Sequence, residues 1–270
     1  MPKQKNKIRK PGDFSPRSNN GVAVQKHITR LGEVLQRVYT DGPSLDTTMT
    51  CKCVCCKIAM PQINYCEFVQ IAMTYWPKLK RKSKIDMICT SMRYFFRHEF
   101  SKWGIMTLIK PCMFLNKKSG RCEIYKDRPL NCKMYGLWPK EEYEKRVDRF
   151  VKAYAEYGLV REDLPNHFQC PLVKRIDDSE ELTTEVISKM YAKLDEIDKS
   201  ISSFTDLQVK NRENYRTFHD WLLLSIFGEQ WLSDLTSFMK FATADVIEDQ
   251  IEKIGEAIKE SGKDLNPTIR

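Results

Sequence analysis

Four cysteines lie within six residues of one another in the segment Cys51-Lys52-Cys53-Val54-Cys55-Cys56. The whole chain has ten cysteines in 270 residues, so this density indicates that the thiols bind one polyvalent partner, such as a metal ion or cluster with several coordination positions. Thiolate sulfur is a good ligand for zinc, iron and copper. A simple zinc knuckle pairs one C-x2-C with a second, distant C-x2-C, and the sequence does not contain that pair. Because adjacent side chains point apart, Cys55 and Cys56 cannot easily reach one tetrahedral ion, which favours a polynuclear cluster or two neighbouring centres.

Four further cysteines can supply ligands from a distance. Cys112, Cys122 and Cys132 are separated by nine residues each, too far apart to close a site alone, and Cys170 adds an eighth thiol. Eight thiols are what two four-thiolate centres need. The radical-SAM spacing C-x3-C-x2-C and the ferredoxin spacing C-x2-C-x2-C are absent. The sequence predicts one or two metal centres, with an iron–sulfur cluster favoured over Zn2+ and with copper or no metal left open; the predicted ligands are Cys51, Cys53, Cys55, Cys56, Cys112, Cys122, Cys132 and Cys170.

The remaining candidates have simpler explanations. Cys66 and Cys89 lie in helical segments beside apolar residues, where a buried thiol packs like a small hydrophobic group. His167 precedes Cys170 by three residues, a ligand spacing, but a lone loop histidine is more often a surface group. These three residues are left out of the site. Arg121 and Arg128 flank predicted ligands and can either offset the negative charge of a thiolate cluster or make polar contacts that stabilise the fold.

Charge and hydropathy limit where the protein acts. The first 30 residues carry eight Lys or Arg against Asp13 alone, and so account for +7 of the net charge of +9. No apolar stretch reaches the length of a membrane span, and no apolar h-region follows the basic start. We therefore expect a cytoplasmic protein, where a reducing environment favours cysteines as metal ligands over disulfides. A second basic run, Lys78–Lys84, could contact nucleic acid, but no nucleic-acid motif accompanies it.

Helical periodicity surrounds the cysteines on both sides. Helices are expected over residues 28–38, Glu67–Tyr75, Lys84–Phe100 and Glu141–Tyr157. Three more are expected in the last third, at Leu182–Ile201, at Tyr215–Phe241, which should be the buried one, and at Asp245–Lys259. We place the first cysteine group on a loop and the segment from Cys112 to Cys132 in mostly irregular structure. The expected organisation is a basic disordered tail over 1–24, a cysteine-cluster metal-binding domain over 25–175 and a helical region over 176–262.

The second cysteine segment carries a specific pattern. Its elements are Pro111-Cys112-Met113-Phe114-Leu115, then Gly120-Arg121-Cys122-Glu123-Ile124-Tyr125, then Arg128-Pro129-Leu130 and Cys132, with Cys55-Cys56 upstream. This pattern resembles the YkgJ-type cysteine-cluster family, which is named for chelation of zinc or iron. The spacing before Cys55 is C-x-C-x rather than the family's more usual C-x2-C-x2. The resemblance runs from about Cys51 to Cys132 and implies metal chelation without naming a reaction.

We therefore expect a mainly α protein, with helices around an irregular cysteine-rich metal-binding segment and a C-terminal helical region. Its expected function is that of an intracellular cysteine-cluster protein that binds an iron–sulfur cluster or zinc in a redox or structural role. One alternative is a cluster-dependent enzyme resembling protein lysine methyltransferases, since flagellin lysine N-methylases resemble the family in their cysteines. The other is a zinc-stabilised interaction module. The expected partners are metal ions and a protein, with nucleic acid weakly supported and no membrane.

Overall fold

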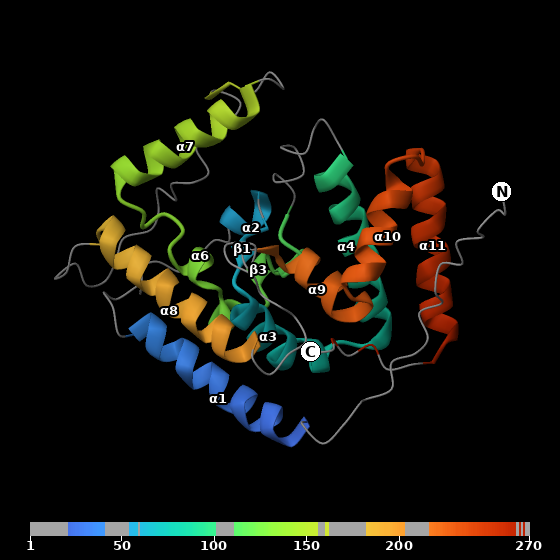
Figure 1. Cartoon of the computed structure of the whole chain (residues 1–270), viewed down its shortest axis with the longest axis horizontal. Coiled ribbons are helices and arrows are strands. Elements are labelled where there is room, and N and C mark those ends of the chain that lie inside the picture. Colours follow the sequence, from blue (N-terminus) through green and yellow to red (C-terminus); the bar gives the residue numbers. More distant parts are fainter. Residues whose placement is uncertain are drawn as a thin grey trace, which may run out of the picture.

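The computed structural model describes residues 21–40, 54–58, 60–100, 111–155, 160–161, 182–202, 216–262, 265 and 267. The predicted mainly α fold is confirmed, and helices dominate these residues (Figure 1). Cys51, Cys53, His167, Cys170 and the tail up to residue 20 lie outside them. The helices are α1 (Gly21–Thr40), α2 (Val54–Ile58), α3 (Tyr65–Thr74), α4 (Arg81–Phe100), α6 (Leu130–Lys133), α7 (Lys140–Tyr154), α8 (Thr184–Ser202), α9 (Phe218–Phe227), α10 (Glu229–Met239) and α11 (Ala244–Glu260).

Helix α3 lies where the helices meet. Helices α1 and α8 pack against it on one side and α9 on the other, and α9 in turn packs against α4 and α10. The α3 sequence is apolar on nearly every face, as a helix enclosed by neighbours must be. Tyr65 and Phe68 of α3 contact Trp221 of α9, with ring centroids 5.0 and 6.3 Å apart. These aromatic contacts connect the part of the core around α1, α3 and α8 to the part around α4, α9 and α10.

Two short strands hold the ends of α3 and α9 together. Strand β1 (Gln62–Ile63) precedes α3 and pairs antiparallel with β4 (Arg216–Thr217), which precedes α9. The indole N–H of Trp221 also donates to the Ile63 carbonyl at 3.1 Å. Both helices therefore start from one hydrogen-bonded point.

The predicted single helix Tyr215–Phe241 was wrong, because the chain forms two helices there. Gly228 separates α9 from α10 with a φ of +83°, a backbone conformation that other residues adopt only at a cost. Helix α9 starts at a capping box, in which Thr217 and Asp220 accept each other's backbone N–H groups. The buried helix is α9, whereas α10 buries only one face.

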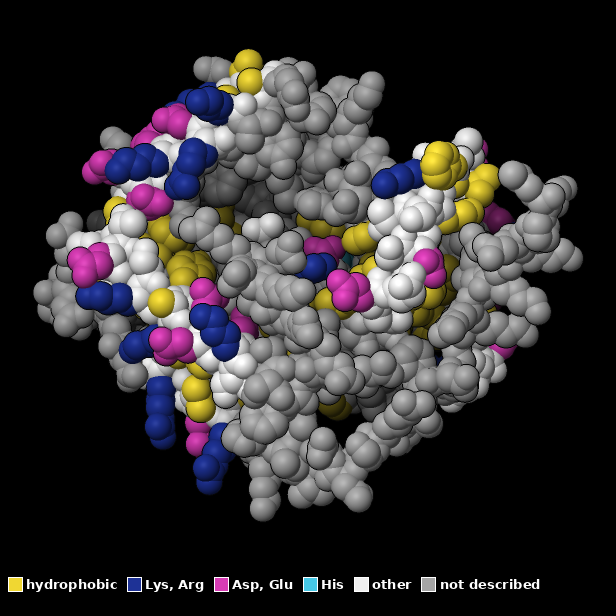
Figure 2. All heavy atoms as spheres, in the orientation of Figure 1, with side chains coloured by type: hydrophobic (Ala, Val, Ile, Leu, Met, Phe, Trp, Pro, Cys, Tyr) yellow, Lys and Arg dark blue, Asp and Glu magenta, His cyan; other side chains and the backbone are white. Residues whose placement is uncertain are grey.

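Most other helices follow their predicted bounds within a few residues. Helix α11 buries Ile247, Ile251 and Ile258 as its periodicity predicted. Helix α1 begins at Gly21, before the expected end of the tail at residue 24. Figure 2 shows charged side chains of both signs over α7 and α8, where Lys145–Glu141 is one of the i,i+4 ion pairs. None of the described helices is long and apolar enough to span a membrane.

Candidate metal centre

The first cysteine pair lies on helix α2 rather than on the predicted loop. Cys55 and Cys56 occupy two of its five residues, and a helix this short shows no periodicity in sequence. The N–H of Cys112 donates to the carbonyl of Cys56 at 2.7 Å. This bond joins the two cysteine segments directly, 56 residues apart in sequence.

Cys122 lies on a small hairpin, in a segment predicted to be irregular. Strands β2 (Leu115–Asn116) and β3 (Arg121–Cys122) pair antiparallel with Leu115 opposite Cys122. The Asn116 side chain shapes the turn, since its Oδ1 accepts the N–H groups of Lys118 and Ser119 at 3.0 and 2.9 Å. The hairpin places the Cys122 thiol beside Cys56.

Four thiols converge from these elements. Hydrogen bonds with Cys112, Cys122 and Cys55, together with burial, raise the pKa of the Cys56 thiol. The pKa of Cys122 is lowered instead. The hydrogen bond with Cys56 is the largest cause and outweighs burial, which raises the pKa, while the Ile124 N–H and Arg128 lower it further. The arrangement therefore favours one thiolate at Cys122 supported by neighbouring thiols.

Cys132 completes the group from α6. The residue is partly exposed, yet its sulfur is enclosed: burial is the largest cause that raises its pKa, followed by Cys112, Cys55 and Cys122. Arg128 lowers the pKa of both Cys122 and Cys132, in the second case against the net upward shift. The positive charge expected near the thiols is thus present at Arg128, whereas Arg121 is exposed.

Residues that the sequence did not single out surround the thiols. The sulfur atoms of Met60 and Cys112 lie 3.8 Å apart. Tyr75 and Tyr94 lie close enough to Cys112 for its charge to contribute to their raised pKa values, although burial is the larger cause for both. The wall around Cys112 is therefore aromatic and apolar, which strengthens electrostatic interactions at the sulfur.

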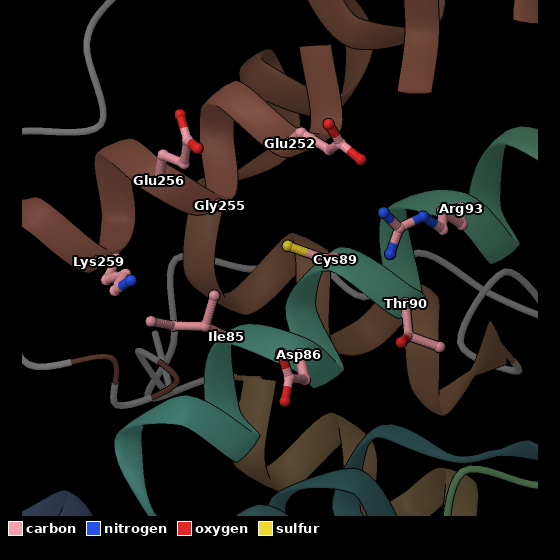
Figure 3. A pocket seen from close by; sticks show the side chains of 9 residues that line it. All are labelled: Ile85, Asp86, Cys89, Thr90, Arg93, Glu252, Gly255, Glu256 and Lys259. Carbon is pink, nitrogen blue, oxygen red and sulfur yellow. The ribbon is translucent and has the colours of Figure 1, made fainter. Parts of the chain in front are cut away.

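Cys66 and Cys89 lie outside this group of thiols, and of the two only Cys66 is buried as expected. Cys66 is fully buried in α3, and its thiol points to the Leu194 carbonyl of α8 at 3.8 Å. Cys89 lines an open groove between α4 and α11, where Figure 3 shows it facing Gly255. A Cβ at Gly255 would meet the Cys89 sulfur at 2.9 Å, so the glycine permits close packing of the two helices.

The donor set suits a thiophilic metal. Within the described residues, no group of three or more Cys, His, Asp or Glu side chains is arranged so that it could hold a metal ion. The thiols are nevertheless hydrogen-bonding neighbours, and three of the eight predicted ligands lie outside those residues. Zinc or iron bound here would draw its ligands from Cys55, Cys56, Cys112, Cys122 and Cys132, and would replace thiol hydrogen bonds with metal–sulfur bonds.

These convergent thiols on short elements define a cysteine-cluster chelating segment. Residues 48–150 match the family model CxxCxxCC, described as a putative zinc- or iron-chelating domain, and this segment is therefore similar to the YkgJ-type family that the cysteine pattern resembles. The match ends within α7 and leaves α8 to α11 outside it. No curated protein and no solved structure matches the chain.

Proposed function

We propose that this protein is a cysteine-cluster metalloprotein whose thiolates hold an iron–sulfur cluster, in a redox or structural role. The observation that carries the proposal is the mutual contact of Cys56 with Cys55, Cys112 and Cys122. Burial and neighbouring thiols raise the pKa values of Cys56 and Cys132, and a cation offsets that cost by binding the deprotonated thiols. Their gathering therefore supports a bound cation as the native state.

The number and spacing of the thiols favour a cluster over a single zinc ion. One tetrahedral zinc uses four ligands, whereas five described thiols converge and Cys51, Cys53 and Cys170 remain as further candidates. Arg128 beside Cys122 and Cys132 suits the net negative charge of a thiolate-bound cluster. When bound, such a cluster supplies electron transfer or cross-links the segments that hold it.

The test is purification under strict anaerobiosis, followed by a visible absorption spectrum and iron, sulfide and zinc analysis of the same sample. Coloured protein with comparable amounts of iron and sulfide supports the cluster. Colourless protein with stoichiometric zinc would refute the cluster and support a zinc-stabilised interaction module. The absence of both metals from protein that stays folded would refute the proposal altogether.

Three substitutions test which cysteines bind the metal. Cys122→Ser and Cys132→Ser should each lower bound metal and stability, because site assembly is coupled to folding. Cys66→Ala is the matched control, since Cys66 is a buried thiol of the same core and lies outside the proposed site. Equal metal retention in all three variants would remove the Cys112–Cys132 segment from the site.

A further inference from the structure

Residues of α6 form hydrogen bonds with β1, α3 and α8. The Leu130 N–H donates to the Glu67 carboxylate of α3 at 2.6 Å. The Asn131 side chain donates to the Gln62 carbonyl at 2.9 Å and accepts from the Tyr191 hydroxyl at 2.5 Å. The residues around Cys132 therefore have partners that do not depend on metal.

Glu67 is the most buried of these partners. Its side chain is 2% exposed and accepts three hydrogen bonds, from Leu130 N–H, the Tyr39 hydroxyl at 2.9 Å and Asn64 N–H at 3.0 Å. A buried carboxylate is tolerated only when such donors compensate its lost hydration. These donors come from α6, α1 and the start of α3, so one side chain connects three elements.

The bond to Leu130 acts where α6 is weakest. The first N–H groups of a helix lack partners within the helix, and a four-residue helix has little stability of its own. A carboxylate at this end both accepts an orphan N–H and interacts favourably with the helix dipole. Lys133, which follows Cys132, lies over the Tyr39 ring at 4.8 Å, so Tyr39 links the other end of α6 to the same glutamate.

We propose that Glu67 is a positioning residue of the metal centre, which holds α6 so that the Cys132 thiol is in place before metal binds. This inference rests on the proposed function, because it assigns Cys132 a metal to bind. Glu67 is not itself a ligand and acts through the backbone of α6. Prior placement lowers the ordering cost of binding and so strengthens metal affinity.

Asp198 provides a matched control for a merely structural effect. It is a fully buried carboxylate of α8 that also accepts hydrogen bonds at the start of α3, from Asn64 Nδ2 at 3.0 Å and Cys66 N–H at 2.7 Å. None of its described hydrogen bonds goes to α6. Its loss should destabilise α3 as loss of Glu67 does, while it leaves the attachment of α6 intact.

The experiment compares the full-length wild type with Glu67→Gln, Asp198→Asn and Cys132→Ser. Zinc affinity is measured by competition with a chromophoric chelator, Co2+ substitution reports thiolate coordination, and thermal melts report stability. Glu67→Gln should weaken zinc binding about 10- to 100-fold and change the Co2+–thiolate band. Asp198→Asn should melt earlier but bind zinc as tightly as the wild type.

Each outcome is decisive for one of the two proposals. Wild-type zinc affinity in Glu67→Gln, with loss of affinity in Cys132→Ser, would overturn the role of Glu67 alone. Full affinity in Cys132→Ser would instead refute Cys132 as a ligand of the proposed centre, which is the premise on which the role of Glu67 rests.

A second measurement needs no variant. Hydrogen exchange of metal-free wild type should show the Leu130 amide protected to the same degree as α3 amides. Exchange of the Leu130 amide at the rate of an unstructured chain, beside protected α3 amides, would overturn the proposal even if Glu67→Gln failed to fold.

Discussion

Two buried groups give the protein opposing pH dependences of stability. His219 in α9 is enclosed by the core, stacks on Tyr94 with ring centroids 4.3 Å apart, and lies 2.8 Å from Ser91 Oγ through its Nδ1. Burial lowers its pKa from 6.5 to about 3. Burial raises the pKa of Glu67 from 4.5 to about 7, against the hydrogen bonds that favour its ionised form.

The signs follow from which state binds the proton. Below pH 6.5 the imidazole of His219 is protonated in the unfolded chain but stays neutral in the folded protein. Its contribution to the free energy of unfolding is therefore present above pH 6.5 and is lost as the pH falls toward 3. Glu67 binds its proton more tightly when folded, so its contribution is present below 4.5 and is lost as the pH rises through 7. Between pH 7 and pH 5, the titration of His219 lowers the free energy of unfolding by about 2 kcal/mol, and the titration of Glu67 raises it by about 2 kcal/mol.

The two effects should therefore nearly cancel in the wild type and separate in two variants. Chemical denaturation of reduced, chelator-treated protein gives the free energy of unfolding at each pH. When the pH is lowered from 7 to 5, the free energy of unfolding of His219→Asn should rise by about 2 kcal/mol relative to that of the wild type. The free energy of unfolding of Glu67→Gln should fall by about 2 kcal/mol relative to the wild type over the same range. Asn is chosen because its amide can keep a hydrogen bond near the position of Nδ1. Difference curves with the same slope for both variants would refute the assignment of these two groups.

Three other substitutions test separate parts of the structure. Gly228→Ala should cost about 1 kcal/mol or more in denaturation experiments, because φ at this position is +83°; an unchanged midpoint would contradict the break between α9 and α10. Leu222→Ala should cost about 2–5 kcal/mol in the same assay since Leu222 is fully buried in α9, whereas exposed Val246→Ala should change stability by about 0.5 kcal/mol or less. Arg128→Gln should raise the pKa of Cys122 and slow its alkylation by iodoacetamide in metal-free protein, as followed by peptide mass spectrometry; faster labelling would exclude Arg128 as its electrostatic partner.

Sequence periodicity predicts an element when one face of a long helix is buried. Ile247, Ile251 and Ile258 mark the inner face of α11 because 17 residues repeat the pattern several times. Across Gly228 the same reasoning fails, since apolar residues continue on both sides and a glycine costs a helix only about 1 kcal/mol. Only the positive φ of Gly228 shows that the helix ends.

The candidate site was only partly predictable for a related reason. Cysteines are rare and their spacing is distinctive, so Cys55, Cys56, Cys112, Cys122 and Cys132 could be grouped from sequence alone. Glu67 could not, because its partners Tyr39 and Leu130 lie 28 and 63 residues away. One local signal existed: Asn64 and Glu67 have the spacing of a capping box, and the Asn64 N–H does donate to Glu67. That signal places Glu67 at a helix start but does not reveal that a second helix start uses the same carboxylate.

The region that matches the chelating family depends on helices beyond it. Helix α3 lies within residues 48–150 and carries Glu67, yet Asp198 of α8 accepts its first N–H groups and Trp221 of α9 packs on Tyr65. Both partners follow residue 150, so a fragment that ends there would expose the aromatic face of α3 and leave its N–H groups to water. The C-terminal helices therefore serve the cysteine segment indirectly. Helices α8 and α9 contact α3, and the Glu67 side chain of α3 accepts the Leu130 N–H at the start of α6, the helix that carries Cys132.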